Sequence, residues 1–251
     1  MTRRMKMKQN IYDNPTFFKE YTSLRESGLT YNDFLEQPAM KTAIGDINGM
    51  LILDLGCGMG DLSKYCADNG AVSVIAVDIS EKMIERAKEE NSDKKVEYLC
   101  QPIEDIELPA ESFDLVISSL AIHYIADYFA LIAKISKLLK EGGRLIFTTE
   151  HPITTAQKEM KGWVKGDKGE ILHWPVDNYQ EEGQRKEHWY VDGVIKYHRT
   201  VSTLINVLTE HGLTVEKVEE PLPTKEGLKK LPKLINEYRK PPFILIQSKK
   251  S

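Results

Sequence analysis

Apolar runs alternate with amphipathic stretches along most of this chain. The apolar runs cover residues 51–53, 72–77, 96–99, 113–119 and 144–149. Such runs are typical of parallel strands that are covered on both faces. Hydrophobic residues recur at helical spacing between them, most regularly from Tyr128 to Leu139. This alternation predicts an α/β protein with a doubly wound, mostly parallel sheet.

The two ends of the chain add to this core. Asn14-Pro15 predicts a capped helix with an apolar stripe that Gly28 ends, and a second helical stretch leads to Gly45. A later helix, ended by Gly212, precedes two further predicted strands at 214–218 and 243–247.

Residues 151–198 interrupt the alternation. They hold all three tryptophans and four of the six histidines. A segment of this length without core strands is usually functional, so we expect an inserted lid. Within it, Glu187 to His198 predicts a hairpin that turns at Asp192-Gly193.

Length and composition limit the possible classes. A chain of 251 residues accommodates one sizeable α/β domain. Its net charge of −4 gives no reason to expect nucleic-acid binding, and no apolar stretch is long enough for a membrane span. The basic start, residues 1–8, lacks the apolar segment of a secretory signal. Three cysteines without metal-ligand spacing favour a cytoplasmic protein without a metal site.

Candidate chemistry is concentrated after the first predicted strand. Gly56, Gly58 and Gly60 stand at alternate positions, Asp54 precedes them, and Asp78 ends the second strand. Glycines let a backbone loop approach a ligand closely. An acid at the end of the next strand is where a ribose is bound in nucleotide-binding half-sheets. The segment therefore predicts a mononucleotide site, with a tight turn that binds nothing as the alternative.

Asp61 distinguishes among nucleotides. It stands where a dinucleotide fingerprint has its third glycine, so an acid occupies the helix start that would hold phosphate. This favours a nucleoside without phosphates and argues against an NAD-dependent dehydrogenase.

The stretch Asp54-x-Gly56-x-Gly58-x-Gly60 resembles the first motif of class I S-adenosylmethionine-dependent methyltransferases. Residues 103–116 and 118–124 are similar to the family's later motifs. The resemblance implies a seven-stranded Rossmann-like sheet whose last strand runs antiparallel between the fifth and sixth. It also implies S-adenosylmethionine as methyl donor and S-adenosylhomocysteine as product.

Carried over residue by residue, the resemblance assigns roles in donor binding. The glycines would line the methionine and ribose portions, Asp54 would hold the amino group directly or through water, and Asp78 would accept both ribose hydroxyls. Ile79 and Met83 would pack on the adenine. The complete candidate donor site is Tyr21, Asp54, Gly56, Cys57, Gly58, Gly60, Leu62, Asp78, Ile79, Met83, Pro102, Ile103, Glu104, Ser119, Leu120 and Ala121.

Two departures from the family's pattern change the predicted adenine contact and the expected class of acceptor. Gln101-Pro102-Ile103 stands where relatives often carry an acid for the adenine amino group, so Gln101 or Glu104 would replace that contact. The chain also lacks the Asn- or Asp-Pro-Pro-aromatic signature after the fourth strand, which argues against methylation of exocyclic base amines.

The acceptor side carries two candidate bases, His123 and His151, each at the exit of a predicted strand. Either could instead be structural. We expect one domain in which residues 1–45 form cap helices, 46–150 the donor-binding core, 151–199 the lid and 200–251 the rest of the core. The expected acceptor is a small molecule rather than RNA or a protein. A non-catalytic sensor of the donor is a further alternative, and the chain would be a monomer or a homodimer.

Overall fold

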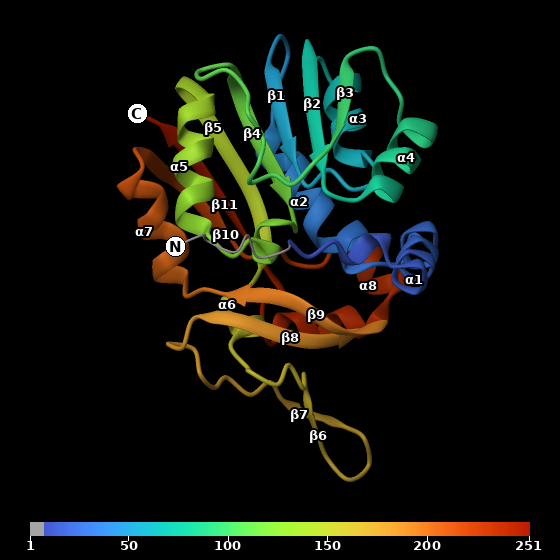
Figure 1. Cartoon of the computed structure of the whole chain (residues 1–251). Coiled ribbons are helices and arrows are strands. Elements are labelled where there is room, and N and C mark those ends of the chain that lie inside the picture. Colours follow the sequence, from blue (N-terminus) through green and yellow to red (C-terminus); the bar gives the residue numbers. More distant parts are fainter. Residues whose placement is uncertain (1–7) are drawn as a thin grey trace, which may run out of the picture.

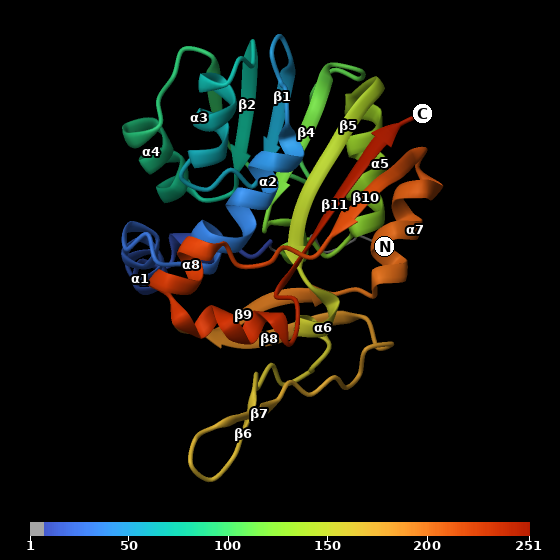
Figure 2. The same ribbon diagram turned by 180° about the vertical axis from the view of Figure 1, so that it is seen from behind.

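The computed structural model describes residues 8–251, and its core is a seven-stranded sheet covered by helices on both faces (Figures 1 and 2). The order of the strands is β10-β11-β5-β4-β1-β2-β3. Only β11 is antiparallel to its neighbours, and it lies between β5 and β10 as predicted. The strands are β1 (Leu51–Leu55), β2 (Ser73–Asp78), β3 (Val96–Cys100), β4 (Phe113–Ser119), β5 (Leu139–Glu150), β10 (Leu213–Glu219) and β11 (Phe243–Lys250).

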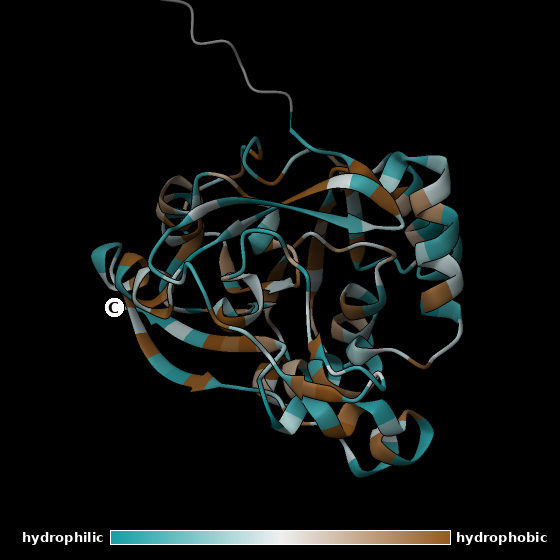
Figure 3. Ribbon diagram, turned by 90° about the horizontal axis from the view of Figure 1, so that it is seen from below, coloured by the Kyte–Doolittle hydropathy of each residue, from teal (hydrophilic) through white to brown (hydrophobic). Residues whose placement is uncertain are grey.

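Helices pack on both faces of this sheet. One hydrophobic cluster joins α2 and α3 to the sheet, and α4 packs beside it on the same face. The opposite face carries α5 and α7. Hydrophobic positions recur along the strands and in stripes on the helices (Figure 3). The helices are α1 (Pro15–Glu26), α2 (Gln37–Ile44), α3 (Asp61–Asp68), α4 (Glu81–Glu90), α5 (Tyr128–Leu138), α6 (Pro152–Thr155), α7 (Val201–Glu210) and α8 (Lys225–Lys230), with short turns η1 (Ile11–Asp13), η2 (Asn32–Glu36), η3 (Ile122–Tyr124) and η4 (Pro232–Tyr238).

Side-chain caps explain where several of these helices begin. Asn14 accepts hydrogen bonds from two backbone amides at the start of α1, as its sequence predicts. The side chains of Ser80, Asp127 and Thr200 each accept one backbone amide hydrogen bond at the start of α4, α5 and α7. Each cap contributes on the order of 0.5–2 kcal/mol and fixes the helix start relative to the strand before it.

A cap covers the carboxyl ends of the parallel strands (Figure 1). It is built from α1, η2 and the hairpin of β8 (Gly183–Trp189) and β9 (Val191–His198). Gln9 links the N-terminal segment to this hairpin, because its side chain exchanges two hydrogen bonds with the backbone of Ile195 in β9. The second hairpin, β6 (Val164–Lys165) and β7 (Ile171–His173), projects away from the sheet (Figure 1).

Two predicted boundaries are wrong. The β8–β9 hairpin turns at Tyr190, which has a φ of 60°, because Trp189 pairs with Val191. Asp192-Gly193 is therefore part of β9. The fifth strand, predicted to begin at residue 144, begins at Leu139 directly after α5 ends at Leu138, and Leu139 pairs with Phe113 of β4.

No helix within residues 8–251 is both long enough and apolar enough to cross a membrane.

Candidate functional site

The loop between β1 and α3 needs each of its three glycines for a different reason. Gly56 has a φ of +79°, and a Cβ there would lie 2.3 Å from the Cβ of Ala121. Gly58 has a φ of +54° with open space around it, so its backbone conformation, not crowding, favours glycine. Gly60 has a φ of +85° and packs against the ring of Tyr98. The loop can therefore approach a ligand with bare backbone.

Asp78 joins this loop to the end of β2. Its Oδ2 accepts a hydrogen bond from the amide of Gly58 at 2.9 Å, and its Oδ1 accepts one from Ser80, also at 2.9 Å. Burial raises the pKa of this carboxyl, while the two amide hydrogen bonds oppose the rise. A carboxylate held in this way keeps lone pairs for the hydroxyls of a ribose.

A cavity of about 510 Å³ opens between the loop, the strand ends and the cap. This volume is in the range of small-molecule sites. The cavity is also lined by aromatic side chains, including Tyr12 of η1 and Trp189 of the β8–β9 hairpin. Thirteen of the predicted site residues line it: Tyr21, Gly56, Gly58, Asp78, Ile79, Met83, Pro102, Ile103, Glu104, Ser119, Leu120, Ala121 and His123.

Four predicted donor residues lie outside the lining. Cys57 and Gly60 shape the loop, and Leu62 is buried in the core beneath it. Asp54 is 1% exposed, and its Oδ2 accepts a hydrogen bond from Ser63 at 2.6 Å. Its other oxygen is buried without a partner, and burial raises the pKa of this carboxyl to about 7. Asp54 does not line the cavity, and its contact with the donor's amino group, directly or through water, stays a prediction.

His151 is also outside the cavity lining. Its Nδ1 accepts a hydrogen bond from the amide of Ile153 and thereby caps α6, and its Nε2 lies 3.1 Å from Glu220. Both ring nitrogens are engaged in structural contacts. The structure therefore gives no support to His151 as a base and assigns it a capping role.

His123 lines the cavity and is 4% exposed. Its Nδ1 lies 3.3 Å from the hydroxyl of Thr149 and 3.5 Å from the amide of Glu150. Burial lowers the pKa of the imidazole to about 4, so the ring is neutral at physiological pH. The Glu150 amide can only donate, so its hydrogen bond to Nδ1 belongs to the tautomer with the proton on Nε2. A base needs the other neutral tautomer, in which Nδ1 donates to the hydroxyl of Thr149 and Nε2 is unprotonated.

A buried ion cluster, which sequence reasoning missed, borders the same half of the cavity. Lys196 of β9 is 4% exposed and lies 2.6 Å from Glu150 and 2.5 Å from Glu187. Burial disfavours the charged form of Glu150, but the ammonium of Lys196 outweighs this and holds the pKa of that carboxyl below its usual value. Glu150 lines the cavity, and one of its oxygens has no hydrogen-bond partner within residues 8–251.

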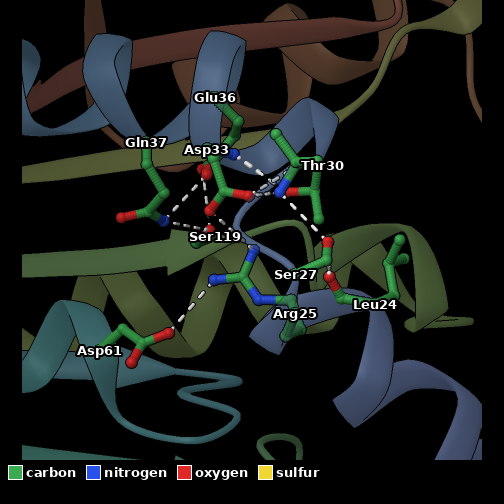
Figure 4. Close-up of polar contacts among 10 residues, drawn as sticks. Leu24, Arg25, Ser27, Thr30, Asp33, Glu36, Gln37, Asp61 and Ser119 are labelled. Carbon is green, nitrogen blue, oxygen red and sulfur yellow. Dashed lines mark hydrogen bonds and ion pairs between the residues drawn. The ribbon is translucent and has the colours of Figure 1, made fainter. Parts of the chain in front are cut away.

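The cap contributes two more residues that sequence reasoning missed (Figure 4). The guanidinium of Arg25 lies 3.1 Å from Asp61 of α3, and Arg25 also lines the cavity. Glu36 is completely buried against Ser119 and Thr148. Arg25 stands one helical turn after the predicted site residue Tyr21, so its place on the same helix face could have indicated a site residue. Nothing in the local sequence marks Glu36 as buried.

Fold and site together define a nucleoside-binding domain with a Rossmann-like sheet, and comparison with known proteins identifies its family. The family described as "Methyltransferase domain" matches residues 53–147. An S-adenosylmethionine-dependent methyltransferase from Mesorhizobium loti is 38% identical, with a TM-score of 0.79, over 86% of this chain and 97% of that one. An uncharacterized protein from Haemophilus influenzae is 36% identical over 98% of this chain and 99% of its own length. A ubiquinone biosynthesis O-methyltransferase from Coxiella burnetii is 36% identical over 41% of this chain and 44% of its own length.

The chain belongs to the S-adenosylmethionine-dependent methyltransferases, and its donor is S-adenosylmethionine. The cavity fits this donor chemically. Asp78 offers acceptors for the ribose, Met83 and Ile103 offer apolar walls for the adenine, and Arg25 offers a cation for the carboxylate. When bound, the donor supplies a methyl group that its sulfonium has already activated.

Proposed function

We propose that this protein methylates a small molecule that enters the aromatic half of the cavity and presents a hydroxyl or amine to His123 and Glu150. The observation that carries the proposal is the enclosure of that half. It is walled by Tyr12, Tyr124 and Trp189, and the cap and hairpin cover it. An acceptor enclosed in this way must be small.

The two polar groups in this half complement an acceptor that carries a hydrogen on its reacting atom. The partnerless oxygen of Glu150 can accept that hydrogen, with a small shift of the side chain, and aromatic faces suit an apolar or cationic body. The chain's own contribution to the reaction is to align the acceptor for in-line displacement and to exclude water. His123, neutral and at the cavity wall, is the proposed base for a hydroxyl acceptor.

Label transfer tests this proposal. The purified protein, the methyl-labelled donor and a cell extract would be incubated together and then separated into small molecules, nucleic acid and protein. We expect label in the small-molecule fraction, and less of it with Trp189→Ala. Label confined to the RNA or protein fraction would contradict a small acceptor, while leaving the assignment of the donor intact.

The acceptors named for relatives do not transfer directly to this chain. The Coxiella enzyme matches over only 41% of this chain. We propose that the cap, including its β8–β9 hairpin, selects the acceptor.

A further inference from the structure

Glu36 is a fully buried carboxylate at the point where the cap meets the ends of β4 and β5. It is 0% exposed. Its Oε1 accepts hydrogen bonds from the hydroxyls of Ser119 at 2.8 Å and Thr148 at 2.7 Å. Its Oε2 accepts one from the side-chain amide of Gln37 at 2.9 Å (Figure 4).

The side-chain amide of Asn32 is a fourth hydrogen-bond donor to Glu36. When the Asn32 amide is oriented to satisfy both neighbours, its nitrogen donates to Glu36 Oε2 at 3.1 Å and its oxygen accepts from Arg25 at 2.7 Å. Burial raises the pKa of this carboxyl, and the hydrogen bonds from Thr148, Ser119 and Gln37 oppose the rise. The amides of Gln37 and Asn32 can only donate to Oε2, so these contacts favour the ionised form.

This buried charge has no direct ion pair. No lysine, arginine or histidine within residues 8–251 forms one with Glu36, although buried charges are ordinarily paired. Arg25 is joined to Glu36 only through Asn32, and its charge opposes the rise that burial causes in the pKa of Glu36. The acidic side chains that line the cavity already have hydrogen-bond or ion-pair partners. Asp78 is bound by two backbone amides, Glu104 lies 3.9 Å from Lys8, and Glu150 lies beside Lys196.

Glu36 does not line the cavity itself, and Ser119 connects it to the cavity. The Ser119 hydroxyl donates to Glu36, and its oxygen accepts from the side-chain amide of Gln37 at 3.4 Å. Ser119 itself lines the cavity, so one lone pair of its oxygen remains for a hydrogen-bond donor on the ligand. Glu36 also holds the neighbouring loop, because Thr148 Oγ1 accepts from the amide of Leu120 at 3.1 Å. Leu120 has a φ of 51°, a strained conformation that this hydrogen bond helps to maintain.

The predicted orientation of the donor brings its ammonium to this part of the cavity. With the ribose on Asp78 and the adenine against Met83, the methionine portion would extend past Gly56, and Ser119 and Arg25 line the same cavity. Arg25 suits the carboxylate, and the α-ammonium beside it then requires an anion or a polarised acceptor.

We infer that Glu36 is the buried counter-charge for the α-ammonium of the methyl donor and acts through the hydroxyl of Ser119. Glu36 is thus a positioning residue, contributed by the cap, that makes amino-acid recognition depend on a closed cap. No acceptor is involved, so the inference stands apart from the proposed function.

The test is a comparison of two ligands on two variants by titration calorimetry. One ligand is S-adenosylhomocysteine. The other is 5′-(3-carboxypropylthio)-5′-deoxyadenosine, which lacks only the α-amino group. The first variant, Glu36→Gln, removes the charge and keeps an oxygen for the two hydroxyls. The matched control, Glu26→Gln, removes an exposed charge from the same cap.

We expect Glu36→Gln to weaken S-adenosylhomocysteine binding roughly tenfold and to change binding of the deamino analogue less than twofold. The control should change neither. Equal weakening of both ligands would reduce Glu36 to a structural role and overturn the inference, as would unchanged binding of both. Ser119→Ala provides a second route with the same expected pattern if Glu36→Gln unfolds. The melting temperature of each variant without ligand reports on folding.

Discussion

Asp78 and Asp54 are buried carboxylates of neighbouring strands, and their hydrogen bonds give them different roles. Asp78 is held by two backbone amides at the cavity wall. Asp54 is enclosed beneath the glycine loop, where Ser63 takes one of its oxygens. Residue type and position in a strand are similar, so the direction of the free lone pairs decides which acid can touch a ligand.

Replacement of Asp78 by alanine should weaken S-adenosylhomocysteine binding, because the ribose loses hydrogen bonds to a charged group. The expected loss is on the order of 1.5–3 kcal/mol by calorimetry. Asp46→Ala, at an exposed position before β1, is the control and should bind normally. Unchanged affinity in Asp78→Ala would remove Asp78 from the donor site.

The buried imidazole of His123 should make stability depend on pH. The folded-state pKa is about 4 and the unfolded value about 6.5, so the unfolded chain binds the proton more readily in this interval. Stability is therefore fully present above pH 6.5 and falls as the pH drops toward 4, by about 3 kcal/mol in total. In urea unfolding, the free energy of unfolding of His123→Gln should fall less than that of the wild type between pH 6.5 and 4. An equal fall in both proteins would contradict the assignment.

Activity provides a separate test of His123. If the acceptor is a hydroxyl, His123→Ala should lower turnover by roughly 10² to 10⁴ while donor affinity stays nearly constant. In the wild-type protein, turnover should fall near pH 4 and not near pH 6.5, because His123 must be neutral to act as a base. A variant with full turnover would leave His123 structural and favour an amine acceptor.

At the scale of elements, the β1–α3 loop and the exit of β4 depend on each other. Their contact is so close that Gly56 and Ala121 leave no space for another atom. Both segments line the cavity, so the shape of the donor site is set by a contact between two strand exits.

Two glycine variants separate crowding from backbone strain in this loop. Gly56→Ala adds an overpacked contact to a left-handed conformation and should destabilise by about 2–5 kcal/mol. Gly58→Ala adds only the conformational cost, about 1–2 kcal/mol, because nothing lies within 4 Å of its Cβ. Urea unfolding measures both, and equal losses would show that the loop relaxes around Ala121.

At the scale of the whole molecule, Lys196 attaches the β8–β9 hairpin to the core. It joins Glu187 of the hairpin to Glu150 at the end of β5. Removing the ammonium would leave two half-buried carboxylates without a cation between them.

Lys196→Ala should therefore lower the free energy of unfolding by about 3–5 kcal/mol and raise amide exchange across residues 183–198. Lys186→Ala, which removes an exposed lysine from β8, is the matched control and should be nearly neutral. Normal exchange in Lys196→Ala would mean that other contacts hold the hairpin in place.

The sequence by itself determined the parts that depend on local order. Strand and helix periodicity predicted the sheet, because burial on both faces imposes continuous apolar runs. The glycine spacing and Asp78 predicted the donor loop, because backbone conformation and strand ends are set within a few residues. The resemblance then supplied the antiparallel strand β11, whose place in the sheet is a long-range matter.

Only the tertiary structure decided which polar side chains meet at the site. Glu36 reaches Ser119 across 83 residues and Lys196 reaches Glu150 across 46, and no local pattern records such contacts. His123 and His151 look alike in sequence, each at a strand exit, yet one lines the cavity and the other caps α6. The physical reason is that periodicity reports burial of a face, whereas the partner of a buried polar group depends on how separate elements pack together.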